Sequence, residues 1–304
     1  MLNDTHIDIH PEVSHALRRS GAVVALESTI ITHGMPYPAN NDMAAKVEAI
    51  VAEEGAVPAT IAVMGGRLKI GLSDGERAAL ATTPGAMKLS RADLPFAISE
   101  GRTGGTTVAA TMIAAHLAGI RVFATGGIGG VHKGAETSFD ISADLDELAR
   151  TPVIVVSAGA KAILDIPKTL EVLETRGVPV VGYGADVMPA FWSRHSDFPA
   201  PLRLDSAEAI ARFQRTREHL GFPGGMLIAN PVPEPDEIPA ARMRGYIDAA
   251  QKAADENGVS GKAVTPFLLQ KILELSDGAS LKTNIALVEN NARLAAKIAN
   301  ALAA

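Results

Sequence analysis

The sequence predicts an α/β fold: a three-layer α/β/α sandwich with a largely parallel or mixed central sheet and a helical C-terminal segment. Short β-branched runs alternate with longer Ala-rich amphipathic runs along the 304 residues, which is the pattern of βα units. Hydrophobic residues make up 47% of the chain but aromatic residues only 4%, so aliphatic side chains must fill the core. That composition is typical of helices packed on a mostly parallel sheet.

In the first half of the chain, β-branched apolar runs predict the strands and Ala-rich amphipathic runs predict the helices. The predicted strands are 23–26, 59–64, 68–70, 96–99 and 122–125. Three helices are predicted, at 38–54, 74–80 and 106–118. Proline near the start and Gly55 after the end support the first helix, Asp74 is the expected cap of the second, and Gly119 ends the third.

The second half continues the alternation and then becomes helical. Strands are predicted at 153–157, 178–183 and 226–229, with helices at 163–176 and 206–220. After Pro239 the pattern predicts helices at 239–257, 265–276 and 281–303. A Pro-rich patch at 231–235 suggests a boundary, but the helices after it would make a poor independent domain. We therefore expect one domain over residues 1–304, with these helices on the edge of the sheet.

Composition excludes several classes of function. The formal net charge is −6, no basic run stands out and aromatic residues are scarce, so nucleic-acid binding has little support. Local cations and helix N-termini can still bind one phosphate. The absence of cysteine excludes disulfides, thiolate catalysis and sulfur-ligated zinc. Because the first twelve residues are polar and no apolar run approaches the roughly 18 residues of a membrane span, we expect a cytoplasmic protein.

A glycine-rich segment, 126–134, follows the predicted strand 122–125. It is not a P-loop, because Lys133 is followed by glycine rather than by Ser or Thr. It also fails the dinucleotide fingerprint, because His132 occupies the place of the last glycine. Two interpretations stay open: a loop that lets a ligand approach the backbone, and an ordinary flexible turn.

Two carboxylates and a hydroxyl follow this loop. Asp140, Ser142 and Asp144 occupy every second position, so in an extended segment they point to one side. Such a group suits Mg²⁺, Mn²⁺ or the hydroxyls of a sugar. Asp144 also precedes Glu147 with the spacing of a capping pair. We favour a cap for Asp144 alone and a functional role for Asp140.

Lys161 follows the buried strand 153–157 through small residues and precedes a predicted helix. A position beside a helix N-terminus, with partial burial, disfavours the charged ammonium group. A neutral lysine can attack carbonyls and form imines, although most lysines are simply solvated at the surface. Glu27 comes directly after strand 23–26, where ligands of α/β folds bind, but an N-cap or ion-pair role fits equally well.

Other candidates have weaker support from the pattern. The segment 104–107 should open the helix at 106 and offer N–H groups and the Thr107 hydroxyl to an anion, unless the threonine only caps the helix. Nothing in its surroundings raises Lys88 above a surface lysine. His33, His116, His132 and His195 lack metal-ligand spacing, and of these we suspect only His132, in the glycine-rich loop.

Five segments together resemble a known family, the pseudouridine-5'-phosphate glycosidases, relatives of the indigoidine synthase A protein. These are ESTIITHGMP (27–36), ATGGIGGVHKGAE (124–136), FDISAD (139–144), AGAK (158–161) and TPFLL (265–269). The resemblance runs from about Val23 to Asn300. Long strings in a fixed order are far more specific than three-residue patterns.

The resemblance implies a reaction and a set of roles. Lys161 would be the imine-forming nucleophile, Glu27 the general acid and base, and Asp140 the ligand of a divalent metal, Mn²⁺ or else Mg²⁺ or Fe²⁺. The expected substrate is a phosphosugar nucleotide, and the protein would be a homotrimer acting downstream of a pseudouridine kinase. A related lyase with another base and a non-catalytic phosphosugar-binding protein stay open as alternatives. The substrate-binding residues expected around these groups are Lys88, Thr107, Val108, Thr125, His132, Ser142, Ala143, Asp144 and Asn284.

Overall fold

The computed structural model describes residues 6–259 and 264–304. Its described strands form one 11-stranded sheet, in which β1, β4, β3, β2, β7, β8, β11, β9 and β10 are neighbours in that order. The strands are β1 (Ile7–Ile9), β2 (Val23–Leu26), β3 (Val57–Met64), β4 (Arg67–Ile70), β5 (Met87–Leu89), β6 (Gly104–Thr106), β7 (Val122–Ala124), β8 (Ile154–Ser157), β9 (Val180–Tyr183), β10 (Leu202–Leu204) and β11 (Met226–Ala229).

The sheet changes character along β3. The first half of β3 pairs in parallel with β2, while its second half pairs antiparallel with β4 and β6. From β2 to β10 all the pairs are parallel. The main strands are buried on both faces and rich in Val and Ile, as parallel strands covered by helices should be.

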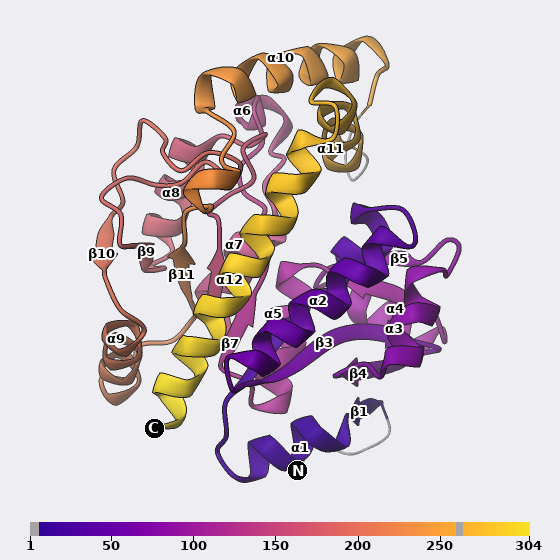
Figure 1. The fold of residues 1–304 in the computed structure, drawn as a ribbon, viewed down its shortest axis with the longest axis vertical. Helices are drawn as coiled ribbons and strands as arrows, with labels where there is room; N and C mark the ends of the chain where they lie inside the picture. Colours follow the sequence, from indigo (N-terminus) through magenta and orange to yellow (C-terminus); the bar gives the residue numbers. More distant parts are fainter. Residues whose placement is uncertain (1–5, 260–263) are drawn as a thin grey trace.

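Helices cover both faces of the sheet (Figure 1). On one face α12 packs across β2, β7 and β8, with α2 and α9 beside it; on the other, α5 packs on β2, β3 and β7 and is followed by α7 and α8. The helices are α1 (Pro11–Arg18), α2 (Ala39–Glu53), α3 (Asp74–Ala81), α4 (Asp93–Ser99), α5 (Val108–Ala118), α6 (Ala135–Ser138), α7 (Ala143–Arg150), α8 (Ile166–Thr175), α9 (Ala207–His219), α10 (Ala240–Glu256), α11 (Val264–Leu275) and α12 (Ala279–Ala303). Two short turns of helix complete the set: the π-helix η1 (Ile30–Gly34) and the 3₁₀-helix η2 (Glu234–Asp236). The predicted three-layer α/β/α sandwich is confirmed.

The strand order reverses between β2 and β7. After β2 the chain moves outward through β3 and β4, and it later returns on the other side of β2 to form β7, β8 and the remaining parallel strands. Ligands of open α/β sheets bind at the carboxyl ends of strands at such a switch point. The carboxyl ends of β2, β7 and β8 lead directly to Glu27, Thr125 and the loop carrying Lys161.

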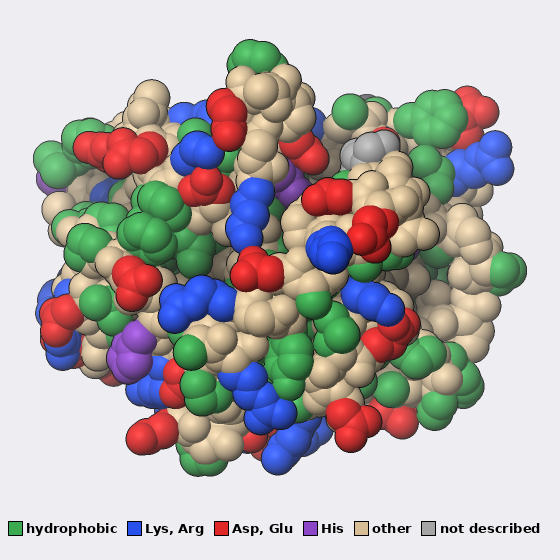
Figure 2. All heavy atoms as spheres, turned by 90° about the horizontal axis from the view of Figure 1, so that it is seen from above, with side chains coloured by type: hydrophobic (Ala, Val, Ile, Leu, Met, Phe, Trp, Pro, Cys, Tyr) green, Lys and Arg blue, Asp and Glu red, His purple; other side chains and the backbone are tan. Residues whose placement is uncertain are grey.

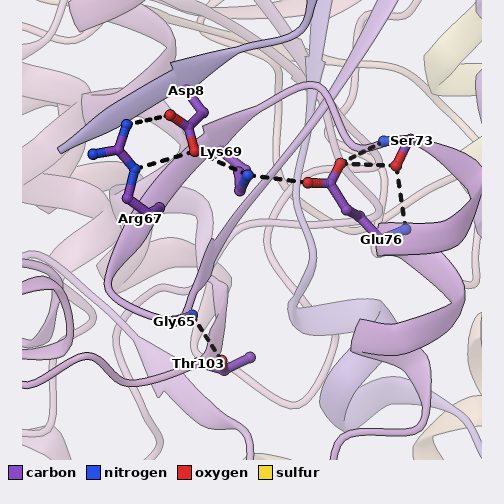
Figure 3. Close-up of polar contacts among 7 residues, drawn as sticks. All are labelled: Asp8, Gly65, Arg67, Lys69, Ser73, Glu76 and Thr103. Atoms are coloured by element: carbon purple, nitrogen blue, oxygen red, sulfur yellow. Dashed lines mark hydrogen bonds and ion pairs between the residues drawn. The ribbon is translucent and has the colours of Figure 1, made fainter. Parts of the chain in front are cut away.

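A chain of charges holds the N-terminal strand to the sheet (Figure 3). Asp8 on β1 is paired with Arg67 and Lys69 on β4, and Lys69 also pairs with Glu76 at 3.1 Å. Glu76 in turn completes a capping box with Ser73 at the start of α3. The two cations lower the pKa of Asp8 far below its ordinary value. This network therefore joins β1, β4 and α3 at the edge of the sheet that β1 forms.

Several predicted elements differ from the structure. Residues 96–99 were predicted as a strand but form the end of α4, whose buried residues Leu94 and Ala97 have the three-residue spacing of one helix face while Phe96 is exposed. Ser73, rather than Asp74, caps α3. Residue Thr106 belongs to β6, so α5 begins later than predicted. The last helix lies across the face of the sheet and not on its edge, since its Ala-rich stripe packs closely on β7 and β8.

No helix of the described part of the chain is both long and apolar enough to cross a bilayer. On the face seen in Figure 2, acidic and basic side chains are interspersed with small apolar patches. A small anionic ligand approaching this face therefore meets no broad field of one sign.

Candidate active site

A cavity with two lobes lies at the carboxyl ends of β2, β7 and β8. Five residues line both lobes and stand where the lobes meet: Glu27, Thr29, Lys88, Lys161 and Thr265. One lobe, called the polar lobe, is lined mainly by charged and hydroxyl side chains. The other, called the apolar lobe, contains Phe191, Trp192 and most of the large aliphatic side chains of the cavity, beside several polar ones. The polar lobe adds Ser90, Asp93, Thr107, Val108, Gly129, His132, Asp140, Ser142, Asp144 and Leu164.

Glu27 is fixed by the residues that follow it. The Ser28 hydroxyl donates to the carbonyl of Ile61 at 2.6 Å and accepts from the Thr106 amide at 2.9 Å. The Thr29 hydroxyl donates to the Thr106 carbonyl at 2.8 Å. These hydrogen bonds join the residues after β2 to β3 and β6. Because Ser28 and Thr29 are held in this way, the backbone of the adjacent Glu27 is held as well.

Burial raises the pKa of Glu27 above its ordinary value, against the opposing effects of Lys161 and of a hydrogen bond from Thr125. A carboxyl group with a raised pKa holds its proton closer to neutral pH and can serve as a general acid.

Lys161 lies in the loop between β8 and α8, held from both sides by backbone hydrogen bonds. Its amide donates to the carbonyl of Ile128 at 3.1 Å, and its own carbonyl accepts from Leu164 at 2.9 Å. The predicted helix start at 163 is wrong, because α8 begins at Ile166 with Asp165 as its cap. Lys161 therefore does not sit at the helix N-terminus; its position is fixed by the bridge between its loop and the glycine-rich loop.

The glycine-rich loop is packed rather than flexible. A Cβ on Gly129 would lie 2.2 Å from the Ser142 hydroxyl, and one on Gly127 would lie 2.7 Å from the Phe191 ring. Gly126 and Gly127 also line the apolar lobe, and Gly129 lines the polar one. Of the two interpretations left open, the flexible turn is wrong. The glycines are needed because side chains and the cavity approach this backbone closely.

Asp144 does not cap α7, contrary to prediction; Ser142 is the cap. The Asp144 carboxylate instead accepts from the amides of Ala109 at 2.9 Å and Gly129 at 2.8 Å. It thereby occupies part of the N-terminus of α5, which the sequence predicted to be open to an anion. The first helical residue, Val108, still lines the polar lobe beside Thr107.

Asp140 is the predicted metal ligand and lies at the rim of the polar lobe. Its side chain is 41% exposed, and its Oδ2 is 4.0 Å from Nδ1 of His132. Among the described residues no three His, Cys, Asp or Glu side chains are grouped to enclose a cation. A single carboxylate nevertheless fits the way Mg²⁺ and similar cations bind, because these cations keep several waters and need few protein ligands.

His132 faces the same lobe as Asp140. Burial lowers the pKa of His132, with Lys88 and Lys161 acting in the same direction and Asp140 opposing them. This electrostatic influence indicates that both lysines lie near the ring. A neutral imidazole in this place can donate or accept a hydrogen bond to a ligand.

The apolar lobe contains most of the residues that the sequence analysis missed. Its walls include buried Phe191 and Trp192, whose rings meet edge to face with centroids 4.8 Å apart. Helix α11 supplies Thr265, Pro266, Leu269, Gln270 and Leu273. The single tryptophan of the chain and the string 265–269 were the available signals, but nothing in the sequence joined them.

Two polar groups face this apolar lobe. Asn284 of α12 lines it, and its buried Oδ1 has no hydrogen-bond partner within the described part of the chain. His33 of η1, which the sequence analysis set aside, lines it too, with Nδ1 2.7 Å from the Thr32 hydroxyl. Partial burial, helped by Lys88, lowers the pKa of His33 and favours the neutral ring.

Two predicted residues do not line either lobe. Thr125 lies behind Glu27, where its hydroxyl donates to the Glu27 carboxylate and it borders a small separate void. Ala143 has an exposed side chain in the first turn of α7. The structure brings together the other predicted residues: Glu27, Lys88, Thr107, Val108, His132, Asp140, Ser142, Asp144, Lys161 and Asn284.

Known proteins resemble this chain over nearly its whole length. The family model described as indigoidine synthase A like protein matches residues 12–301. A protein of Mesorhizobium japonicum named pseudouridine-5'-phosphate glycosidase is 76% identical over 97% of both chains. One with the same name from Dinoroseobacter shibae is 65% identical, again over 97% of both.

Two solved structures share the fold. The prealnumycin C-glycosynthase AlnA, crystallised with ribulose 5-phosphate, has a TM-score of 0.92 and 39% identity, covering 99% of this chain and 98% of its own. An indigoidine synthase A-like protein of Thermotoga maritima has a TM-score of 0.90 and 33% identity, covering 100% of this chain and 99% of its own. These likenesses confirm the resemblance noted at the five sequence segments.

Proposed function

Because this chain belongs to the indigoidine synthase A-like family, we propose that it cleaves, reversibly, the C–C glycosidic bond of pseudouridine 5'-phosphate to give uracil and ribose 5-phosphate. The chain is an enzyme of the same kind as its curated relatives. The observation that carries the proposal is the convergence of Glu27 and Lys161 where the two lobes meet. The two parts of a nucleotide match the two lobes: the flat base suits the apolar lobe, and the anionic sugar phosphate suits the polar lobe.

The polar lobe is the better place for ribose 5-phosphate. Lys88 supplies a cation, Thr107 and Ser142 supply hydroxyls, and Val108 opens helix α5. The apolar lobe suits uracil, because Phe191 and Trp192 offer flat apolar walls and Asn284 offers an amide to a pyrimidine edge. With this orientation the C1'–C5 bond lies at the junction, beside Glu27 and Lys161.

The carbon leaving group determines the chemistry. Glu27 protonates the ring oxygen as the C1'–O bond breaks, and the uracil ring gives up its N1 proton and supplies the electrons for a C1'=C5 double bond. The neutral amine of Lys161 adds to C1', and C5 takes up a proton. The C1'–C5 bond then breaks with its electron pair passing into the uracil ring, whose N1 takes up a proton again, while the lysine nitrogen forms a double bond to C1'. Water hydrolyses this imine to release ribose 5-phosphate and the amine.

We further propose that Asp140 holds a divalent cation, Mn²⁺ or else Mg²⁺ or Fe²⁺, which when bound offsets the negative charge of the phosphate. Asp140 lies at the rim of the polar lobe and is partly exposed, so a hydrated cation can reach it. His132 beside it would contact the ligand rather than complete a cage of protein donors.

The deciding experiment uses the purified protein with Mn²⁺ and pseudouridine 5'-phosphate. Free uracil is followed by chromatography, and a parallel sample is treated with borohydride and analysed by mass spectrometry. Release of uracil together with a ribose-phosphate adduct on Lys161 would support both the reaction and the imine. A folded, Mn²⁺-loaded sample that gave neither would refute the proposal.

A second candidate comes from the C-glycosynthase AlnA, whose structure contains a pentulose phosphate. An aromatic acceptor larger than uracil would need a roomier apolar lobe, and that lobe is closed on one side by Phe191 and Trp192. Incubating ribose 5-phosphate with a panel of pyrimidines and larger aromatics separates the two; we expect uracil to be preferred.

The biological setting is also a proposal. We propose that the chain acts in the cytoplasm, in the direction of nucleotide breakdown, on the product of a kinase that phosphorylates pseudouridine. We propose a homotrimer as its assembled form, which light scattering of the purified protein tests directly.

A further inference from the structure

Arg91 and Glu147 form an ion pair between two walls of the polar lobe. Nε and Nη2 of Arg91 donate to the two carboxylate oxygens of Glu147 at 2.7 and 2.8 Å. The Glu147 side chain is only 1% exposed, while that of Arg91 is 48% exposed. The Thr151 hydroxyl also donates to Glu147. Glu147 is thus a buried carboxylate whose charge is balanced by one half-exposed arginine.

The two residues belong to different walls of the lobe. Arg91 lies in the turn between β5 and α4, close in sequence to Lys88 and next to Ser90, both of which line the lobe. Glu147 lies one turn after Asp144 on α7, and Asp144 lines the lobe too. The ion pair therefore joins the segment that carries Lys88 to the segment that carries Asp144, and neither Arg91 nor Glu147 lines the lobe itself.

The wall that carries Lys88 is built on short strands. Strand β5 pairs with β6 alone among the described strands, and β6 pairs with the far end of β3 and is bonded through Thr106 to Ser28 and Thr29. The wall that carries Asp144 is tied to its neighbours by this carboxylate, which accepts from the amides of Ala109 and Gly129.

We propose that Arg91 is a positioning residue that, through Glu147, sets the distance between Lys88 and the start of α7, and so the affinity for the substrate's phosphate. The planar guanidinium makes two parallel bonds to a carboxylate and fixes direction as well as distance, which an ammonium group cannot do. This inference rests on the proposed function, since it takes the polar lobe as the phosphate site.

The test compares Arg91→Ala and Arg91→Lys with Arg176→Ala. Arg176 is the matched control because its Nε pairs with Asp146 of the same helix at 2.8 Å, and neither residue lines the cavity. We expect Arg91→Ala to raise KM for pseudouridine 5'-phosphate about tenfold, equivalent to ~1.4 kcal/mol, with kcat changed by less than about twofold. Arg91→Lys should fall between wild type and Arg91→Ala, and Arg176→Ala should leave KM unchanged.

Two further measurements separate positioning from loss of stability. The affinity for ribose 5-phosphate, measured by calorimetry, should fall in parallel with KM for Arg91→Ala and not for Arg176→Ala. In the double variant Arg91→Ala with Glu147→Gln, KM should rise no further than in Arg91→Ala alone, because the two residues act as one unit.

Several outcomes would overturn the inference. A KM and ribose 5-phosphate affinity that stay at wild-type values in Arg91→Ala, with only the melting temperature lowered, would make the pair purely structural. An equal rise in KM for Arg176→Ala would show a general effect of loosening α7. Wild-type protein that neither releases uracil nor binds ribose 5-phosphate would instead refute the proposed function, and this inference with it.

Discussion

Lys161 owes its place to backbone contacts rather than to a helix end. The loop that carries it is bridged to the glycine-rich loop, which follows the neighbouring strand β7. The sequence could predict that this lysine follows a buried strand, since the apolar run before it is clear. It could not predict the bridge, because pairing between two loops leaves no periodic pattern in either.

Replacing this lysine tests its proposed role directly. Lys161→Ala should lower kcat by about a thousandfold or more, because it removes the amine that is proposed to form the imine. The borohydride-trapped adduct should disappear from the mass spectrum, while the circular dichroism spectrum should be unchanged. Lys133→Ala, an exposed lysine of the glycine-rich loop, is the control and should keep full activity. Near-normal turnover by Lys161→Ala would exclude the imine.

The raised pKa of Glu27 should make the free energy of unfolding depend on pH. At pH values below about 4.5 the group is protonated in both the folded and the unfolded chain, so wild type and Glu27→Gln should be nearly equally stable. As the pH rises past this value, the unfolded chain releases its proton first, and the wild type loses stability that the variant keeps. Urea midpoints between pH 4 and pH 8 measure this difference.

The activity of the same pair of proteins gives an independent check. Glu27→Gln should be inactive at every pH, and wild-type kcat should decline as the pH rises through the raised pKa of Glu27. Thr125→Val would remove the hydrogen bond that opposes this shift and move the decline to higher pH. A wild-type stability profile parallel to that of the variant would contradict a buried, proton-holding Glu27.

Asp140 should control metal affinity. Asp140→Asn should weaken Mn²⁺ binding by about tenfold or more, because a hard cation loses its charged oxygen ligand. Calorimetric titration measures this, and chelation of wild-type protein should abolish activity that added Mn²⁺ restores. Asp186→Asn, which changes a surface aspartate paired with Arg203, is the control. Unchanged Mn²⁺ affinity in Asp140→Asn would return Asp140 to a structural role.

At the scale of elements, long amphipathic helices and a buried apolar strand were predicted well, and very short strands were not. Strand β11 was predicted residue for residue, and α9 and α10 to within one residue at each end. The short strands β5 and β6 were missed, because three-residue strands that contain glycine or lysine have no alternating pattern. These missed elements carry Lys88 and support Ser28, so the local pattern gave Lys88 no place in the site and only the family resemblance predicted it.

Strand β1 offers a test of how one element is attached. Asp8→Asn should lower stability at pH 7 by at most about 1 kcal/mol, since its ion pairs are partly exposed and screened. Arg67 and Lys69 lower the pKa of Asp8, so its stabilising effect is present above the ordinary value of 3.8 and is lost as the pH falls below it. Thermal unfolding of both proteins at pH 7 and pH 3 should show the difference shrinking. A constant difference would mean that packing, not charge, is lost.

At the scale of the whole molecule, α12 joins parts that are distant in sequence. It lies diagonally across the sheet beside α2 in Figure 1, and its buried Asn291 donates to the Thr125 carbonyl and accepts from the Asn230 amide. The sequence predicted this helix but not its place, because an Ala-rich stripe fits a face or an edge equally well. Only the three-dimensional contacts distinguish the two.

The prediction of a single domain can therefore be tested by unfolding. We expect one cooperative transition in calorimetry, because α12 contacts both sides of the strand-order reversal. Asn291→Ala should shift that whole transition, lowering stability by about 1–3 kcal/mol through lost buried hydrogen bonds. Lys297→Ala, an exposed position of the same helix, should have no effect. Two separable transitions would argue for two domains.

The two sides of the apolar lobe differ in how well they should tolerate amino-acid substitutions. The glycine-rich side has no space for even a methyl group at Gly127, so any change there would displace Phe191. Helix α11 is different: Leu268 and Ile272 anchor it in the core, while Leu269 and Leu273 face the lobe from partly exposed positions. A library designed to accept a new base should therefore vary these two leucines and leave the loop intact, since the anchor of the helix and its contact with the ligand lie on separate faces.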